Sequence, residues 1–146
     1  TGSLLFNIAS NLSYANNILS GNGMSLQDEI YFIQNRIIKN LAEKGPCVIV
    51  GRCADYILRE REDVLNVFIY ADMESKLERA VTHFGVDKES APTALKKKDK
   101  ARSNHYKYYT DQEWGMAPNY DLSLNSGILG IDGCVEMIAQ ALKIAK

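Results

Sequence analysis

"VLNVFIYADMESKLERAVTHFG", residues 64–85, reads as a strand that leads directly into a helix. Residues 64–71 are rich in β-branched and aromatic side chains, which is typical of a buried strand. Asp72 then offers a side-chain oxygen as a helix N-cap. Gly85 marks the end of the helix that runs through "MESKLERAVTHF". A strand joined to a helix in this order is the repeating unit of α/β folds with a parallel sheet.

The same alternation extends to both sides of this unit. "CVIV", residues 47–50, is a short apolar run bounded by turn residues and predicts a second buried strand, with Val50 inside the sheet. "YDLSLN" predicts a third strand. Because three strands make a thin sheet, we expect a further central strand at or before the irregular start of the chain. The predicted helices cover residues 26–44, 53–60, 86–110 and 132–145.

Composition narrows the class of protein. The chain has 146 residues, 46% of them hydrophobic, and a net charge of −1, which gives no overall basic field for nucleic acid. No window approaches the roughly 18 apolar residues of a membrane span. Cys47, Cys53 and Cys134 are an odd number without CxxC spacing, so free thiols in a reducing compartment are expected. We therefore expect a cytoplasmic protein.

Polar residues follow the predicted strands at the edge where α/β sheets bind ligands. Arg52 presents a planar fork of donors suited to phosphate or to the polar edge of a base. Gly51 would let the backbone bend and a ligand come close. The alternative is that Arg52 caps a helix end or pairs with an acidic neighbour at the surface. The residues at the three strand ends are Gly51, Arg52 and Asp55, then Asp72, then Asn125 and Ser126.

A second constellation lies in "LKKKDKARSNHYKYYTDQEW", residues 95–114. Helical spacing places five of its side chains on one face, and Lys98 adds charge one turn before the arginine. Clustered cations beside aromatic rings suit a polyphosphate and a base. The alternatives are a solvated helix with an Asp–Arg pair and, disfavoured by the negative net charge, a nonspecific nucleic-acid patch. The residues on this face are Leu95, Asp99, Arg102, Tyr106 and Tyr109.

Other chemically interesting residues carry weaker signals. His83 and His105 lack metal-ligand spacing, so we predict no protein metal site. Cys53 is expected to be an inert, small apolar residue, and Trp114 a packing anchor beneath a loop. The sequence contains no GxxxxGK[ST] phosphate loop.

These segments resemble the bacterial cytidylate kinase-like proteins, in the nucleoside monophosphate kinase branch of the P-loop kinases. The blocks that carry the resemblance are "GPCVIVGRCADYIL", "LNVFIYADMESKLERAV", "KKKDKARSNHYKYYTDQEWG" and "NYDLSLNSGILGIDGCVEMI", in the family's order. The resemblance implies a three-layer α/β fold with a parallel sheet of about five strands, helices on both faces and a helical lid. It implies one domain over residues 1–146, with a monophosphate-binding region and helix at 1–44 and the lid at 90–115.

The resemblance also implies roles for individual residues. Arg52 and Asp55, with Gly51, would bind the monophosphate acceptor. The lid would close its cations over ATP and the transferring phosphoryl group, with Arg102 first and Lys98 and Lys100 beside it. The weaker candidates are Arg79, Asp99 and Tyr106.

The implied activity is phosphoryl transfer from ATP, with Mg²⁺, to a nucleoside monophosphate such as CMP or dCMP. The family's phosphate loop would precede Thr1, and cysteine and alanine in "GRCAD" depart from the family pattern, which leaves the acceptor open. Two alternatives remain: a non-catalytic nucleotide-sensing or interaction module, and a P-loop kinase with a different small acceptor. Small-molecule nucleotides are the expected partners, without nucleic acid or membrane, and a homo-oligomer is left open.

Overall fold

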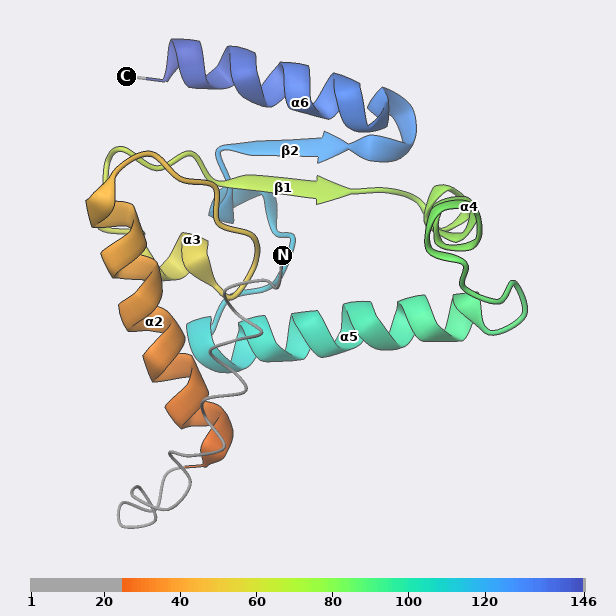
Figure 1. Cartoon of the computed structure of the whole chain (residues 1–146), viewed down its shortest axis with the longest axis horizontal. Helices are drawn as coiled ribbons and strands as arrows, with labels where there is room; N and C mark the ends of the chain where they lie inside the picture. The colour runs from red at the N-terminus through yellow and green to blue at the C-terminus, as the bar shows by residue number, and fades with distance from the viewer. Residues whose placement is uncertain (1–24, 146) are drawn as a thin grey trace. The chain divides into compact units, whose positions relative to one another are not determined.

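The computed structural model describes residues 25–145. The chain divides into two compact units, residues 1–37 and 38–146, and each is described by itself. In chain order the elements are α2 (Leu26–Lys44), α3 (Ala54–Ile57), β1 (Val67–Tyr70), α4 (Met73–Phe84), α5 (Ala91–Thr110), the 3₁₀ turn η1 (Ala117–Asn119), β2 (Leu122–Asn125) and α6 (Ser126–Ile144), as labelled in Figure 1.

The described part of the first unit is the beginning of α2. The Asp28 backbone N–H donates to Ser25 Oγ at 3.2 Å, and this hydroxyl donates to the Asp28 carboxylate at 2.7 Å. Ser25 therefore caps the start of α2 through its hydroxyl oxygen. The part of the predicted monophosphate-binding region that covers residues 1–24 lies outside the described residues.

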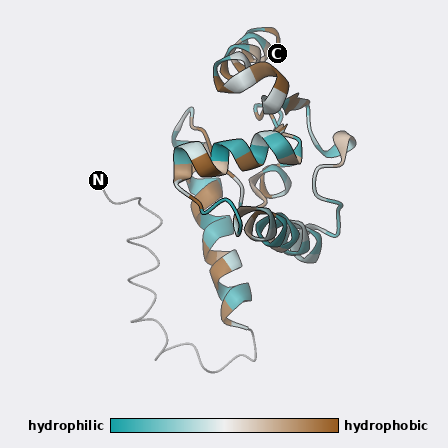
Figure 2. Cartoon of the chain, turned by 90° about the vertical axis from the view of Figure 1, so that its right-hand side faces the viewer, coloured by the Kyte–Doolittle hydropathy of each residue, from teal (hydrophilic) through white to brown (hydrophobic). Residues whose placement is uncertain are grey.

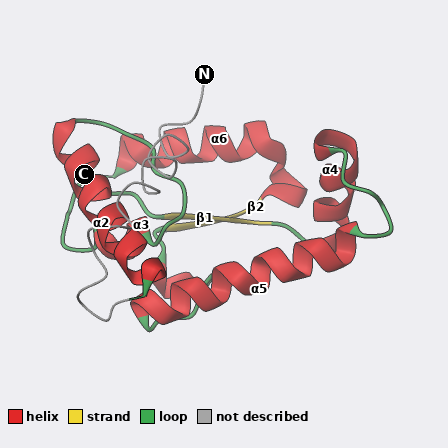
Figure 3. Ribbon diagram, turned by 60° about the horizontal axis from the view of Figure 1, so that its bottom comes forward, coloured by secondary structure: helices red, strands yellow, loops and turns green. Residues whose placement is uncertain are grey.

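In the second unit, β1 and β2 pair in parallel, with Val67 opposite Leu122 and Tyr70 opposite Asn125. α6 packs against both strands, and α5 lies on the other side of the sheet (Figures 1 and 3). The mixed α/β class with a parallel sheet is confirmed. Among residues 25–145 the sheet has two strands, so the five strands and the full three-layer fold that the resemblance implies are not shown.

The prediction of a buried strand at residues 47–50 is wrong. This segment forms no strand, and Val48 and Val50 are 93% and 87% exposed. A strand needs a neighbour for its backbone hydrogen bonds, and among residues 25–145 β1 pairs only with β2. Apolar composition alone predicted the strand, and it could not supply that neighbour.

The helix boundaries follow local chemistry. Asp72 caps α4 by accepting from the Ser75 backbone N–H at 2.8 Å, and Gly85 ends that helix in the left-handed region, as predicted. Asn125 caps α6 by accepting from the Gly127 N–H at 3.0 Å, so this helix begins six residues before the predicted residue 132. Gly130, with φ 69° and ψ 177°, interrupts α6 and separates its first turn from the predicted segment.

Buried side chains lie where the helices meet the strands and one another. Leu124 of β2 and Cys134 of α6 are 5% and 2% exposed. Ala80 of α4 and Ala91 of α5 are also buried, where those two helices pack together. Apolar and polar residues alternate along α6, the helix that leads to the C-terminus in Figure 2. In the described part of the chain, no helix combines the length and the apolar content that a bilayer span needs.

Candidate functional site

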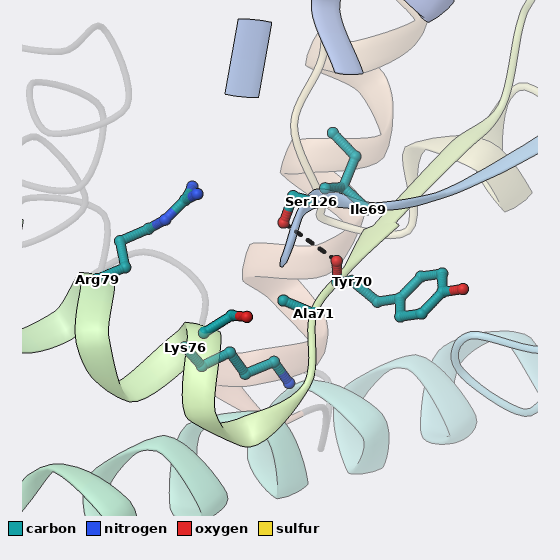
Figure 4. Close-up of a pocket in the computed structure, with 7 residues that line it drawn as sticks. Ile69, Tyr70, Ala71, Lys76, Arg79 and Ser126 are labelled. Carbon is teal, nitrogen blue, oxygen red and sulfur yellow. Dashed lines mark hydrogen bonds between the residues drawn. The ribbon is translucent and has the colours of Figure 1, made fainter. Parts of the chain in front are cut away.

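A small pocket lies at the carboxyl ends of the two parallel strands (Figure 4). There the Ser126 hydroxyl, at the start of α6, donates to the Tyr70 carbonyl at 3.1 Å and ties the two strand ends together. The pocket has a volume of about 130 Å³. This is the sheet edge at which open α/β folds bind ligands. The lining residues are Ile69, Tyr70, Ala71, Ser75, Lys76, Arg79 and Ser126.

Two cations from α4 reach this pocket. Arg79 is one of the candidates that the sequence singles out, and the structure places it in the pocket lining. Lys76 was missed, although its position signals it: it lies one helical turn after the Asp72 cap, directly beyond the carboxyl end of β1. Figure 4 shows both side chains extending from α4 near the Ser126–Tyr70 hydrogen bond.

Asp99 connects this edge of the sheet with α5. Its carboxylate accepts from Lys76 Nζ at 2.7 Å and from Arg102 Nη1 at 3.1 Å. The Asp99 and Lys76 side chains are 25% and 31% exposed, so water screens this pair less than a fully exposed one. The Asp–Arg pair that was the alternative for this helix therefore exists, and Lys76 from a second helix shares the same carboxylate. Arg102 itself remains largely exposed.

The two lysines singled out as candidates in the predicted lid project from α5 into solvent. Lys98 and Lys100 are exposed, and no ion pair involves either of them within residues 25–145. With Arg102 they give α5 a cationic stretch close to Asp99. Each exposed lysine is strongly hydrated, so a single contact with an anion gains little. An anion binds to such a stretch only if it contacts several of these cations at once.

Arg52 lies on a tight turn between residues 46–50 and α3. Gly51, Arg52 and Cys53 all have positive φ angles, 70°, 59° and 56°. Arg52 is exposed, and among the described residues it forms no ion pair with Asp55 or Asp72. The surface salt bridge considered as an alternative is therefore not formed.

Asp55 is instead held by Tyr106, one of the weaker candidates. The Tyr106 hydroxyl donates to Asp55 Oδ2 at 2.6 Å, and it lies 3.1 Å from Gln112 Oε1. Burial, followed by the hydrogen bond with Asp55, raises the pKa of Tyr106, so the phenol keeps its proton. A phenol can donate only one hydrogen bond, and here it donates that bond to Asp55. The Gln112 contact is then a hydrogen bond only if the amide turns its NH₂ group toward the tyrosine.

The remaining candidates have structural surroundings. The Trp114 ring packs edge-on against Phe68, with 5.3 Å between centroids, and is the packing anchor that the sequence predicts. His105 is half-buried, and burial and then the charge of Arg52 lower its pKa. Cys53 is buried and its thiol pKa is raised to about 11, mainly by burial, so the thiolate is scarce at neutral pH.

A second, more open concavity of about 470 Å³ lies on the sheet face that carries Phe68 and Tyr70. Lys76 borders it as well as the smaller pocket, so one lysine faces both spaces. The concavity is lined by Phe68, Tyr70, Lys76, Trp114, Gly115, Ala117 and Ser123.

The structure is therefore that of an α/β protein in which cations from two helices lie near the carboxyl ends of parallel strands. Residues 3–128 match the Cytidylate kinase-like family, and the chain belongs to this family. It is similar to a cytidylate kinase of Archaeoglobus fulgidus, with 30% identity over 112 residues that cover 74% of this chain. The chain spans 59% of the length of that relative.

A solved structure shares the fold. A crystal structure of an uncharacterized protein from Eubacterium ventriosum superimposes with a TM-score of 0.76 at 32% sequence identity. The match covers 83% of this chain and 68% of that protein.

Proposed function

We propose that this protein transfers a phosphoryl group from ATP to a nucleoside monophosphate, with CMP or dCMP as the acceptor. Family membership supports a nucleotide kinase, and the A. fulgidus relative carries the name cytidylate kinase. The observation that carries the proposal is the Asp99 junction. It brings a cation of the predicted lid, Arg102, together with a cation of the sheet edge, Lys76.

This arrangement suits phosphoryl transfer because that reaction needs positioning and charge stabilisation more than covalent help. An incoming phosphate can replace the Asp99 carboxylate as the partner of Lys76 and Arg102, since both groups offer oxygen acceptors to the same donors. Lys98 and Lys100 add charge on the same helix. Arg52, with Gly51 and Asp55 beside it, is assigned to the acceptor.

The described residues fit nucleotide-borne Mg²⁺ better than a dedicated metal cage. Residues 25–145 contain no group of three or more His, Cys, Asp and Glu side chains that could hold a metal ion. Mg²⁺ commonly binds through substrate phosphates and water with few protein ligands. When bound with ATP, it would neutralise charge on the phosphates, and the lid cations would orient them. The full three-layer fold, with a parallel sheet of about five strands, belongs to the same proposal.

The test is acceptor-dependent ADP formation with Mg·ATP across CMP, dCMP, UMP, AMP and GMP. Two preparations are compared, the 146-residue chain and the full-length gene product, each with its intact mass recorded. Turnover with one pyrimidine monophosphate supports the proposal and identifies the substrate. Absence of turnover with every monophosphate in the full-length product would reject it.

Two substitutions then separate the assigned roles. We expect Arg52→Ala to raise KM for the acceptor, because Arg52 would bind the acceptor in ground and transition states alike. We expect Arg102→Ala to lower kcat, since its charge would act on the transferring group. Arg59→Ala is the matched control: this exposed arginine lies over the Tyr56 ring and pairs with Glu60. Equal effects of all three substitutions would contradict the assignment.

A further inference from the structure

The turn that carries Arg52 has an unusual backbone. Gly51, Arg52 and Cys53 lie consecutively in the left-handed region, which L-residues other than glycine rarely adopt. Non-glycine residues persist there only where their surroundings hold them. The direction of Arg52 is therefore set by whatever fixes this turn.

Two kinds of contact fix it. On the apolar side, Cys53 and Ala54 are 4% and 8% exposed, and α3 continues as a single buried turn. On the polar side, Asp55 accepts the hydrogen bond from Tyr106, a residue 51 positions away on α5. Tyr106 is only 4% exposed, so this bond is shielded from competing water.

Asp55 is also the carboxylate that could compete for Arg52. Asp55 lies three residues after Arg52, at the start of α3, so the two groups share one turn of the chain. They nevertheless form no ion pair in the described structure. The Tyr106 hydroxyl donates to Asp55 Oδ2 at 2.6 Å, and this charge-assisted bond holds the carboxylate at α5.

We propose that Tyr106 is a positioning residue that holds the Asp55 carboxylate at α5 and so leaves the Arg52 guanidinium available to the acceptor phosphate. This inference rests on the proposed function for the identity of the acceptor. It adds a role for the base of the predicted lid, because Tyr106 and Arg102 lie on the same helix, α5, one helical turn apart.

The test compares Tyr106→Phe with Tyr108→Phe. Both substitutions remove one phenolic oxygen from α5, but the Tyr108 side chain is 72% exposed. Without the Tyr106 hydroxyl, Asp55 should capture Arg52. We expect KM for CMP to rise about tenfold, the loss typical of a hydrogen bond to a charged group, with kcat changed by less than about twofold. Tyr108→Phe should leave both constants unchanged.

A double-mutant cycle distinguishes this role from a merely structural one. Because Asp55 is itself assigned to the acceptor, the reference is Asp55→Asn alone. In the double variant Tyr106→Phe/Asp55→Asn, the neutral amide no longer attracts Arg52, so KM should lie within about threefold of that of Asp55→Asn. A packing defect would raise KM in both backgrounds. A similar rise in both backgrounds, or equal constants for Tyr106→Phe and the wild type, would overturn the proposal.

A second readout does not depend on turnover. NMR of the arginine Nε–H groups reports hydrogen exchange with water, which slows when a guanidinium is paired. The Arg52 signal should exchange more slowly in Tyr106→Phe than in the wild type, and rapidly again in the double variant. If no monophosphate is phosphorylated, the proposed function fails while this measurement still decides the Tyr106 proposal. Unchanged Arg52 exchange in Tyr106→Phe would reject it.

Discussion

Gly115 leaves room for the Phe68 ring in the aromatic cluster next to the sheet. Replacing this glycine with alanine should therefore destabilise the protein strongly. Gly115 has φ +80°, and a Cβ added there would lie 2.9 Å from Phe68 Cζ and 3.1 Å from Phe68 Cε1. Phe68 cannot easily move away, because its ring packs against Trp114 at 5.3 Å and Tyr120 at 4.9 Å between centroids. The new methyl group therefore meets a ring that is held on two sides.

Two costs combine in Gly115→Ala. The left-handed conformation costs an L-residue about 1–2 kcal/mol, and forcing a methyl group into a packed cluster costs about 1–3 kcal/mol. We expect the free energy of unfolding to fall by about 2–5 kcal/mol. For a chain of this size, Tm should fall by roughly 5–15 °C.

Urea unfolding, followed by circular dichroism and by Trp114 fluorescence, measures the loss. Trp114 is the single tryptophan and lies beside the substituted residue, so circular dichroism guards against a purely local signal. Gly85→Ala is the matched control, because Gly85 has φ +61° but nothing within 4 Å of the added Cβ. It should lose only the conformational part, about 1–2 kcal/mol. If Gly115→Ala loses no more than Gly85→Ala, the steric argument is wrong.

Three further predictions concern the site and its surroundings. In Gly127→Ala, the added Cβ would lie 2.6 Å from Ser75 Oγ, so the start of α4 should be displaced and urea unfolding should show a loss of about 1–2 kcal/mol. Asp99→Asn should cost about 1 kcal/mol in low salt and less in 0.5 M NaCl, since it removes an ion-pair partner of Arg102; a loss independent of salt would contradict this. The third concerns pH. Burial raises the Cys53 thiol pKa from 9.0 to about 11, so the unfolded chain loses this proton at a lower pH than the folded protein does. The stability that the protonated thiol contributes is therefore fully present below pH 9 and is lost as pH rises toward 11. Stability measured across that range should therefore fall less steeply in Cys53→Ala, and equal slopes would refute the assignment.

The sequence predicted the elements whose signals are local. The strand at β1, the Asp72 cap and the Gly85 stop each depend on residues within one or two turns of one another, and each is confirmed. The segment 47–50 failed for the opposite reason. Its apolar residues are compatible with a strand, but a strand is completed by a partner elsewhere in the chain, and composition carries no information about that partner.

The candidate site divides in the same way. Helical spacing placed Asp99 and Arg102 on one face, and their ion pair follows from that spacing. Lys76 enters the site from another helix, 23 residues away, and the Tyr106–Asp55 hydrogen bond spans 51 residues. Such pairings depend on how α3, α4 and α5 are placed around the sheet. A list of charged residues therefore identifies candidates, while their partners come from the tertiary structure.

The ion-pair partners of these cations also explain how the cations can discriminate between anions. Lys76 and Arg102 are both engaged by Asp99, so an anion binds there only if its contacts exceed those of the carboxylate that it displaces. A single-charged anion gains little from that exchange, whereas a polyphosphate can meet both cations and the lysines along α5 together. The situation at Arg52 is reversed. There the Tyr106 hydroxyl, a neutral donor, holds the Asp55 carboxylate, and the guanidinium stays unpaired. Asp99 thus competes with ATP for the cations assigned to it. Asp55, held by Tyr106, does not compete for Arg52, the cation assigned to the acceptor.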